Sequence, residues 1–412
     1  MNKTLINICC WFIPKKKNKK HFREKHGKIK SPLPIPATPS IRAINYQIQD
    51  NKFATIKIQN NTVAVIEVCW HGEVFPSIVN YYSRLGYNVH LFLSIETEKL
   101  TFGNPLTRTN FSQNVEIFYV SRESFLETLK KTSFFTNYKS IFIPSIFDSF
   151  FKDIYGIYAN INTYIKNYGI NNVFYVEHDF IETLNIGENL KTLRNSLVKA
   201  KHVFSIRPNV EKLPFLTCSY FGKIKKHKKN EKIKFIASGG IWKGSKLRNF
   251  DLLFETIKKL IKNNIINFEV VFTGVNDKYN FKDLEGYLKF YNKGVGCVPF
   301  YNAIENGDFI LWNIDSTCDD YDKYLNFGTS GTYGLTLGFH KIPIIEENLA
   351  KKHNFTKNNA ILYGDLYEAM KRAIEMKNNE YDKMENEVKK LKEDLEKKSL
   401  NNLANQISLL TI

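Results

Sequence analysis

Short apolar runs alternate with amphipathic stretches along most of this chain. In the first half, runs rich in β-branched and aromatic residues recur at 62–69, 86–94, 114–121, 138–145, 171–179 and 200–209. In the second half they recur at 234–240, 268–274, 308–314, 341–347 and 359–365. Buried strands that are separated by helical stretches predict parallel sheets covered by helices on both faces. The pattern therefore predicts an α/β protein.

Two segments interrupt this alternation and divide the chain. Residues 31–40 carry four prolines in ten residues, which predicts an extended linker, and a lysine-rich segment at 223–234 separates the two halves. From residue 377 onward, apolar residues recur at helical spacing among charged residues and asparagines. We therefore expect a basic segment and linker over 1–40, a first α/β domain over 41–222, a second over 223–376, and a C-terminal helix over 377–412.

The first strand of the second half is followed by glycines and cations before a helix begins. The loop contains Gly239, Gly240, Lys243, Lys246 and Arg248, and Asn249 is placed to cap a helix whose apolar residues share one face. Ligands of open parallel sheets bind at the carboxyl ends of strands, where glycines let the backbone approach a phosphate and a helix N-terminus favours an anion. The loop thus predicts a phosphate site, with a tight connection carrying solvated cations as the alternative.

A second loop of the same kind precedes the helix that leads to the strand at 341–347. It is rich in glycine and hydroxyl groups and contains Thr329, Ser330, Gly331 and Thr332. Backbone N–H groups and hydroxyls at a helix start form an uncharged anion cradle. Two cradles on strands that a doubly wound sheet brings together fit a diphosphate better than a single phosphate. The alternative is an ordinary, well-capped helix.

These stretches, quoted as "FIASGGIWKGSKLRNFDLLFETIKKL", "FEVVFTG", "GTSGTYGLTLGFHKIPII" and "NNAILYGDLYEAMKRAI", resemble the donor half of GT-B-fold glycosyltransferases. The resemblance spans residues 62–376 and is most specific in the second half. It implies two facing Rossmann-like domains, the second of which binds a nucleotide-sugar. It further implies a metal-independent enzyme of hexosyltransferase type, for which the nucleotide-sugar is a substrate and no cofactor is needed.

Two further features of the sequence bear on this resemblance. The start "ICCWFIPKKKNKK" is similar to that of enzymes building lipopolysaccharide or lipooligosaccharide at the inner membrane. Many retaining family members carry a Glu where this chain has Leu335 and Thr336, so the residue that would meet the donor ribose or sugar is absent. Glu346 and Glu347 are the carboxylates that would partly substitute. Retention and inversion of configuration both stay open.

The first half supplies the candidates for acid–base chemistry. His71 and Glu73 follow its first strand, and His178 and Asp179 end a later one, so that both pairs would lie at the carboxyl edge of a sheet. A histidine titrates in the range needed for a base that takes a proton from an acceptor hydroxyl. Either pair is equally compatible with a structural role. Arg207, at the end of this half, would either face the diphosphate or brace the hinge.

A possible metal motif lies in the second half. Asp320 and Asp322 have one residue between them, as in the DxD motif of the other major glycosyltransferase fold, where a divalent cation bridges the diphosphate. A GT-B site manages the charge of the leaving group with helix dipoles and cations instead. We therefore expect no metal.

The formal charge of +18 points to an anionic partner, and its distribution shows which kind. Residues 1–30 contain nine Lys and one Arg against one Glu, a net charge of +9, and these cations follow a short apolar stretch with Trp11 and Phe12. This arrangement favours the cytoplasmic face of an anionic membrane, with a disordered basic tail as the alternative. Seven further Lys against one Glu lie in residues 223–234, and the near balance of the remainder argues against a nucleic-acid groove. Six cysteines without CxxC spacing fit a reducing compartment.

The sequence therefore predicts a cytoplasmic enzyme, peripheral on the inner face of the cell membrane, that moves a sugar from a nucleotide diphosphate-sugar to a lipid-linked or glycan acceptor in bacterial envelope polysaccharide synthesis. The alternative is a non-catalytic protein that binds a nucleotide-sugar or glycan on the same scaffold, which the missing Glu favours. A nucleic-acid-binding protein is a third possibility that rests on charge alone.

Overall fold

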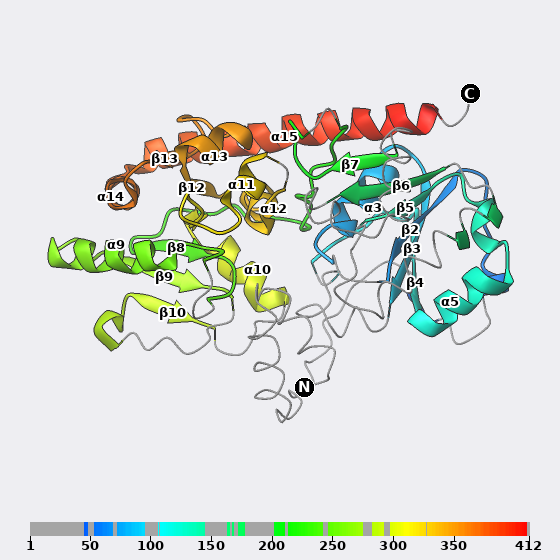
Figure 1. The fold of residues 1–412 in the computed structure, drawn as a ribbon, viewed down its shortest axis with the longest axis horizontal. Coiled ribbons are helices and arrows are strands. Elements are labelled where there is room, and N and C mark those ends of the chain that lie inside the picture. Colours follow the sequence, from blue (N-terminus) through cyan, green and yellow to red (C-terminus); the bar gives the residue numbers. More distant parts are fainter. Residues whose placement is uncertain are drawn as a thin grey trace. The chain divides into compact units, whose positions relative to one another are not determined.

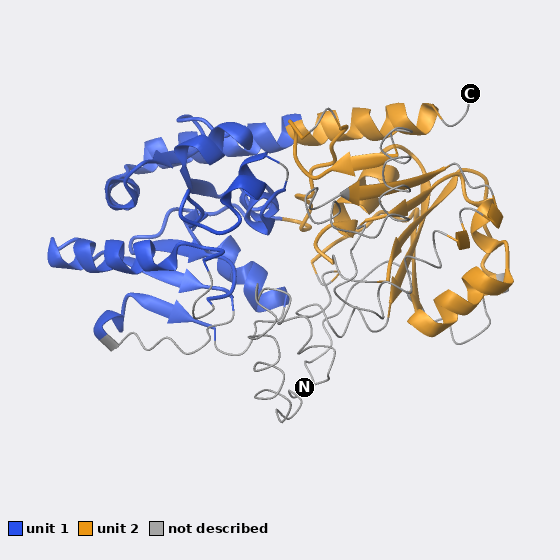
Figure 2. Ribbon diagram, in the orientation of Figure 1, with its two compact units in different colours: residues 1–32, 224–394 blue, residues 33–223, 395–412 orange. Residues whose placement is uncertain are grey.

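The computed structural model of the protein describes residues 45–47, 53–68, 72–94, 106, 108–144, 163–164, 167–168, 172–177, 202–210, 213–241, 246–274, 282–291, 297–326 and 328–409. The described residues form two compact units, which Figure 2 shows in different colours. Those between 224 and 394 belong to unit 1. Those between 45 and 223, together with 395–409, belong to unit 2.

Unit 1 is built on a six-stranded parallel sheet (Figure 1). Its strands are β8 (Ile233–Ala237), β9 (Phe268–Phe272), β10 (Leu288–Phe290), β11 (Phe309–Leu311), β12 (Ile342–Glu346) and β13 (Ile361–Tyr363). Their order in the sheet is β10-β9-β8-β11-β12-β13. This is the doubly wound order in which the chain first builds one half of the sheet and then returns to build the other. The reversal between β8 and β11 creates a topological switch point at the carboxyl edge.

Helices cover both faces of this sheet. They are α9 (Phe250–Lys262), α10 (Cys297–Glu305), α11 (Tyr321–Asn326), α12 (Gly331–Gly338), α13 (Glu347–Lys352) and α14 (Leu366–Glu375), with a 3-10 turn, η5, at Lys282–Leu284. The apolar faces of α9 and α14 share one core with the alternate β8 residues Phe235 and Ala237. The intervening Ile236 faces the other side of the sheet and is also buried. Burial on both faces explains why the strands are continuous apolar runs.

Unit 2 repeats this topology with one additional strand. Its strands are β1 (Asn45–Gln47), β2 (Thr62–Glu67), β3 (Asn88–Ser94), β4 (Val115–Val120), β5 (Ile141–Ile143), β6 (Val173–Glu177) and β7 (Val203–Ser205). They are parallel and lie in the order β1-β4-β3-β2-β5-β6-β7. Two apolar cores fill the two faces, one under α3 (Phe75–Arg84) and the other under α5 (Arg122–Lys131), η2 (Phe53–Thr55) and η4 (Phe134–Asn137). The switch point of this sheet lies between β2 and β5.

The C-terminal helix α15 (Asn378–Ser408) contributes to both units. Its first half places Tyr381 and Met384 in the core of unit 1. Its second half places Leu403 and Ile407 in a core of unit 2, where the Ser399 hydroxyl also accepts a hydrogen bond of 2.9 Å from the backbone N–H of Thr217. The helix is therefore an integral part of each core.

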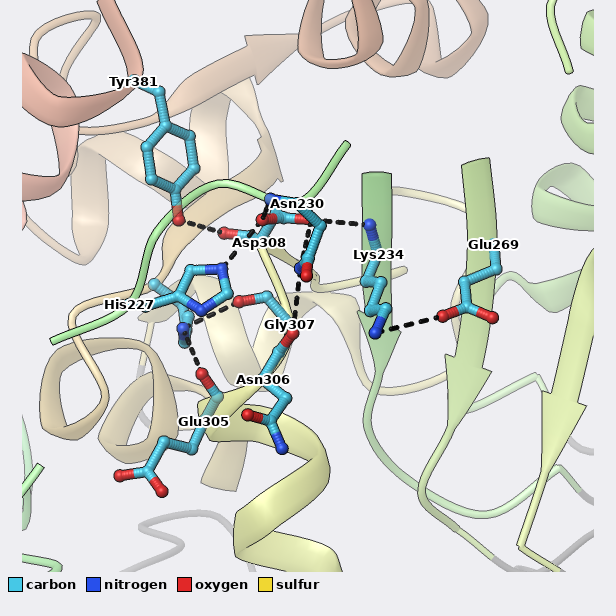
Figure 3. Close-up of polar contacts among 10 residues, drawn as sticks. His227, Asn230, Lys234, Glu269, Glu305, Asn306, Gly307, Asp308 and Tyr381 are labelled. Atoms are coloured by element: carbon cyan, nitrogen blue, oxygen red, sulfur yellow. Dashed lines mark hydrogen bonds and ion pairs between the residues drawn. The ribbon is translucent and has the colours of Figure 1, made fainter. Parts of the chain in front are cut away.

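The lysine-rich segment that leads into β8 is fastened to the amino edge of the unit 1 sheet (Figure 3). The carboxylate of Asp308, which directly precedes β11 and is 0% exposed, is the anchor. It accepts hydrogen bonds from His227 Nε2 (2.8 Å), the Lys234 N–H (2.7 Å), and the Asn230 backbone and side chain (2.9 and 3.0 Å). Burial alone would raise the pKa of this carboxyl group, but the hydrogen bonds outweigh burial and hold the pKa below its usual value.

The predicted fold class is confirmed: two Rossmann-like α/β units and a C-terminal helix. Each strand expected from an apolar run is present. Two strands were missed, namely β1 and β10, which have three residues each and lie at the edges of the sheets. Among the helices that the structure describes, none is both long enough and apolar enough to cross a membrane.

Candidate functional site

The turn after β8 lies at the switch point of the unit 1 sheet. Gly239 has a φ of +104°, a conformation that side chains disfavour. The turn also passes very close to Gly274, the second residue after β9. A Cβ added at Gly274 would lie 1.8 Å from the Gly239 carbonyl oxygen. Glycines at 239 and 274 thus allow two strand ends to approach each other without intervening side chains. Such a bare backbone is what a bound phosphate requires.

The start of α12 meets this turn. Ser330 is the N-cap residue, and its hydroxyl accepts a hydrogen bond of 3.1 Å from the Thr332 N–H. The Thr332 hydroxyl in turn lies 2.8 Å from the Ser238 hydroxyl, at the end of β8. The two turns that the sequence predicted to converge are therefore in direct contact. Their hydroxyl groups form one polar surface at the beginning of α12.

Arg248 joins the two turns. Its guanidinium group donates to the Trp312 carbonyl oxygen (2.6 Å), to Ser330 Oγ (2.8 Å) and to Thr332 Oγ1 (3.3 Å). All three acceptors are uncharged, and Arg248 forms no ion pair with any residue in the described part of the chain. Burial lowers the pKa of the guanidinium group, which means that the charge is poorly solvated.

The position of Arg248 is electrostatically unfavourable in the absence of an anion. A helix N-terminus carries a positive partial charge, and the Arg248 cation is hydrogen-bonded to the first residues of α12. The two positive charges repel each other unless an anion lies between them or beside them. A bound phosphate would neutralise both and accept hydrogen bonds from both.

Several buried polar atoms near this edge lack a hydrogen-bond partner among the described residues. They belong to Thr273, which follows β9, to Asn313, which follows β11, and to Thr329, which precedes α12. Asn313 is 2% exposed, and both polar atoms of its side chain are unpaired. Unpaired buried polar atoms destabilise a fold unless water or a ligand supplies the missing hydrogen bonds. Their position at the carboxyl edge is consistent with a ligand site.

A neighbouring set of hydrogen bonds holds the start of α9. Asn249 is the N-cap residue, as the sequence predicted, because its side-chain oxygen accepts from the Leu252 N–H. Its amide nitrogen donates to Asp315 (2.7 Å), which also accepts from the backbone and hydroxyl of Thr317. Arg248 is thus fixed by the residue that follows it.

The carboxylates considered as substitutes for the missing Glu have defined positions. Glu346 caps α13 by accepting from the Leu349 N–H (2.9 Å), and it accepts a second hydrogen bond from the Tyr321 hydroxyl (2.9 Å). Burial, followed by the neighbouring Glu346, raises the pKa of Tyr321 to about 12. Glu347 lies exposed in the first turn of α13. Glu346 is therefore already engaged within the protein.

The remaining predicted donor-site residues are distributed as follows. Gly240 and Gly331 lie at the two turns, and Lys246 is exposed, with its carbonyl oxygen accepting from the Asp319 N–H (3.0 Å). Lys243 lies outside the described residues. Arg207 belongs to unit 2, is 1% exposed, and donates weakly to the Pro208 carbonyl oxygen (3.4 Å).

Of the predicted catalytic residues, only Glu73 lies in the described part of the chain. It is exposed in the turn that precedes α3, at the carboxyl edge of the unit 2 sheet. His71, His178 and Asp179 lie outside the described residues. The catalytic roles of all four stay predictions.

The two aspartates of the possible metal motif lie at the start of α11. Asp320 lies 3.8 Å from the Lys323 ammonium group, and Asp322 is exposed in the first turn of α11. Within the described ranges, no three His, Cys, Asp or Glu side chains are placed to hold a metal ion. The basic segment 1–30, to which membrane association was assigned, is outside the described residues.

Sequence reasoning missed the contacts that organise this site. Arg248 was valued only for its charge, and Ser238, Gly274 and Asn313 were not singled out. A signal existed for Gly274, because it follows a buried strand in the same way as Gly239. No local pattern marks Asn313, whose burial depends on residues distant in the sequence.

No family model matches the chain, and no curated protein matches it in sequence. Among solved structures, a glycosyltransferase from Rickettsia africae ESF-5 is similar to it at 12% identity and a TM-score of 0.48, over 85% of this chain and 99% of that chain. Trehalose-6-phosphate from E. coli bound with UDP-2-fluoro glucose is similar at 10% identity and a TM-score of 0.47, over 84% and 99%. Arabidopsis thaliana UGT89C1 complexed with UDP-L-rhamnose is similar at 10% identity and a TM-score of 0.45, over 86% and 100%. At these values the fold assignment rests on the strand order of the two sheets.

Proposed function

We propose that the protein is a glycosyltransferase that takes a sugar from a nucleotide diphosphate-sugar and passes it to a lipid-linked or glycan acceptor. One observation carries the proposal. Arg248 lies at the N-terminus of α12, at the switch point of a Rossmann-like sheet, and its acceptors among the described residues are all uncharged. This arrangement favours an anion with several oxygens, and the second hydroxyl-rich turn extends the polar surface to the size of a diphosphate.

The same groups would assist the transfer step. When the bond between the sugar and the diphosphate breaks, negative charge develops on the departing phosphate oxygen. Arg248, the α12 N-terminus and the hydroxyls of Ser330 and Thr332 would stabilise that charge, and they are already held in place by their mutual hydrogen bonds. No metal ion is needed for this role. In unit 2, Glu73, His71, His178 or Asp179 would orient or deprotonate the acceptor hydroxyl.

The finer parts of the proposal rest on the sequence. The resemblance to enzymes of bacterial envelope polysaccharide synthesis supports a hexosyl donor and an envelope acceptor. The apolar and polybasic segment 1–30 supports peripheral binding at the cytoplasmic face of the cell membrane. Deleting residues 1–30 should abolish binding to anionic vesicles and leave nucleotide binding unchanged.

A second candidate is a nucleotide-sugar or glycan-binding protein without catalytic activity. The specific observation in its favour is the missing Glu: Leu335 and Thr336 occupy its expected position, and Glu346, considered as a substitute, is engaged as a helix cap. Incubation with UDP-, GDP- and CMP-sugars, with and without acceptor extract, separates the candidates. Release of the free nucleotide indicates transfer, whereas binding without release indicates the second candidate.

The donor site is tested by replacing Arg248 with Met. The wild-type protein should bind UDP or another member of a nucleotide panel, and R248M should bind it about 10- to 100-fold more weakly, since a charge-assisted hydrogen bond contributes about 1.5–3 kcal/mol. Titration calorimetry measures the affinity. Arg372→Met is the matched control, because Arg372 is an exposed arginine of unit 1 that pairs with Glu380.

A second variant separates loss of binding from loss of structure. Arg248→Lys keeps the charge but loses the forked geometry, and it should recover part of the affinity at an unchanged unfolding midpoint. The proposal is wrong if no nucleotide of the panel binds the wild-type protein, or if R248M binds as tightly as R372M.

A further inference from the structure

Unit 2 carries an open hollow at the amino edge of its sheet. Its lining residues come from two stretches. Residues 56 and 58–62 lie before and at the start of β2, and residues 134 and 137–139 lie before β5. Its volume is about 670 Å³, within the range of about 300–1,000 Å³ that is usual for small-molecule sites. Because parallel strands all begin at this edge, the hollow lies at the opposite end of the sheet from Glu73. It therefore belongs to no site described above.

Four carboxamide side chains line the hollow, those of Gln59, Asn60, Asn61 and Asn137. Three of them are held at one end by a hydrogen bond within the protein. Gln59 Oε1 accepts from Asn88 Nδ2 (3.4 Å), Asn61 Nδ2 donates to the Gly86 carbonyl oxygen (3.2 Å), and Asn137 Nδ2 donates to the Phe134 carbonyl oxygen (3.2 Å).

The other ends of these side chains remain available. Within the described ranges, no further hydrogen bond engages the Gln59 amide N–H groups, the side-chain oxygens of Asn61 and Asn137, or the Asn60 carboxamide. A carboxamide presents donors and acceptors together, so that a set of them can bind neighbouring hydroxyl groups, each of which donates and accepts. Because one end is already fixed, little side-chain freedom is lost when a ligand binds.

One wall of the hollow is apolar. The partly exposed ring of Phe134 contributes to it, and this ring is held edge-on against Phe53, with centroids 5.4 Å apart. Ile56 and Ile58 continue the wall and are partly buried against the same core. A rigid aromatic face beside hydrogen-bonding groups suits a ligand that has one apolar face and polar edges.

The described lining of the hollow argues against a strongly charged ligand. Among the lining residues that the structure describes, Lys139 is the only one charged at neutral pH, and none is a carboxylate. Nothing there resembles the arginines or the helix N-terminus that recognise phosphate groups. The Tyr138 hydroxyl, which is buried, is paired with His90 (2.9 Å) and does not face a ligand.

We propose that this hollow is a binding site for a neutral saccharide. The carboxamides of Asn60, Asn61 and Asn137 would hydrogen-bond to its hydroxyl groups, and the ring of Phe134 would pack against the apolar C–H face of a sugar ring. The site goes beyond the proposed transfer reaction, because neither Arg248 nor Glu73 contributes to it. On a protein that extends or modifies glycans, it would hold a glycan chain at a second point.

The experiment uses the full chain and three named probes, maltotriose, cellotriose and chitotriose. Saturation-transfer difference NMR should detect binding of at least one probe to the wild-type protein. A double variant, Asn60→Ala with Asn137→Ala, should weaken that binding about 10-fold or more, since two neutral hydrogen bonds are lost. Both side chains are exposed, so the variant should keep the fold. Asn110→Ala, an exposed asparagine elsewhere in unit 2, is the matched control and should bind as the wild type does.

Each outcome decides the proposal. It is overturned if none of the probes binds, or if the double variant binds as tightly as the control. It is also overturned if inorganic phosphate competes with the saccharide and Lys139→Met removes both, because the hollow would then be an anion site. UDP titration of the same variants keeps this result separate from the donor site, since the double variant should bind UDP normally whether or not it binds a saccharide.

Discussion

The two edges of the unit 1 sheet each hold a charged side chain in a largely buried setting, and the two charges are treated in opposite ways. At the amino edge, the Asp308 carboxylate accepts from His227, Asn230 and the Lys234 N–H, so that four of its hydrogen bonds come from within the protein. At the carboxyl edge, the partners of the Arg248 guanidinium group in the part of the chain that the structure describes are all uncharged oxygens. One charge is fully compensated, and the other is not.

The difference is the reason for which we assign Asp308 a structural role and propose a binding role for Arg248. Asp308 joins the connecting segment to the sheet, and a ligand would find no free hydrogen-bonding position on it (Figure 3). Arg248 lies beside a helix N-terminus that repels it and near the unpaired side chain of Asn313. A protein tolerates such an arrangement when a ligand completes it. The burial of a charged group therefore indicates its role only when its hydrogen-bond and ion-pair partners are also known.

The largest effect is expected from Asp308→Ala. Removal of the carboxylate leaves donors from three residues without their acceptor, and since a hydrogen bond to a charged group contributes about 1.5–3 kcal/mol, the loss should be about 3–5 kcal/mol. The free energy of unfolding of unit 1 should fall by this amount, measured by guanidinium denaturation. Hydrogen exchange should show faster opening of β8 and β11. Nucleotide affinity of the fraction that remains folded should not change.

Asp251→Ala is the matched control for this variant. Asp251 is an exposed carboxylate in the first turn of α9, where its removal should cost less than about 1 kcal/mol. If both variants lose the same stability, Asp308 is not the anchor of the amino edge, and the contrast between the edges fails.

An intermediate effect is expected at the carboxyl edge from Gly274→Ala. The new Cβ would lie 1.8 Å from the Gly239 carbonyl oxygen, so the turn after β8 must move. Overpacking of this kind costs about 1–3 kcal/mol, and displacement of the turn should weaken nucleotide binding about 10-fold or more. Titration calorimetry and denaturation measure the two effects on one preparation.

Gly364→Ala provides the comparison for this prediction. Gly364 also follows a strand at the carboxyl edge, but a Cβ there would meet nothing within 4 Å. It should bind nucleotide as the wild type does. Equal affinities for G274A and G364A would show that the contact between the turns after β8 and β9 is unrelated to binding.

The fold could be predicted from the sequence because its signals are local. Strands buried on both faces appear as continuous apolar runs, and the alternation with helices fixes a doubly wound topology. The strands β1 and β10 were not predicted, because three-residue edge strands such as "LKF" contain no such apolar run. The lysine-rich segment was recognised as a connection, but its attachment to Asp308 was not. His227 and Asp308 are 81 residues apart, and no local pattern pairs them.

The site was predictable only in outline for the same reason. Glycines and hydroxyls after a strand mark the two turns, and the topology brings them together. Which cation matters is decided by three-dimensional packing. Arg248 is held by Trp312 and Ser330, which lie 64 and 82 residues away in the chain, whereas Lys246 is exposed. The sequence pattern does not distinguish Arg248 from Lys246, although of these two side chains only that of Arg248 is hydrogen-bonded to the turns of the site.

The smallest effect is expected from a pH titration of the amino edge through Lys341. This lysine is 1% exposed, and its ammonium group donates to the carbonyl oxygens of Glu305 (2.8 Å) and Gly307 (2.7 Å) at the end of α10. Burial lowers its pKa to about 8, and the neighbouring Glu385, Asp308 and Glu305 only partly oppose this shift. The unfolded chain, with a lysine pKa near the usual value of about 10.4, binds more protons between these two values. Stability must therefore rise with pH above 8.

Between pH 8 and about 9.5, the free energy of unfolding should increase by about 1–2 kcal/mol through this group. Lys341→Met should lose that increase while keeping the aliphatic packing, so the measured quantity is the difference in slope between the two proteins. Lys258→Met, at an exposed position on α9, should keep the wild-type slope. If K341M and the wild type show parallel pH profiles, the lysine is not held in a low-dielectric setting. The amino edge would then be more open to water than the saturated hydrogen bonding of Asp308 implies, and the contrast with Arg248 would be weaker.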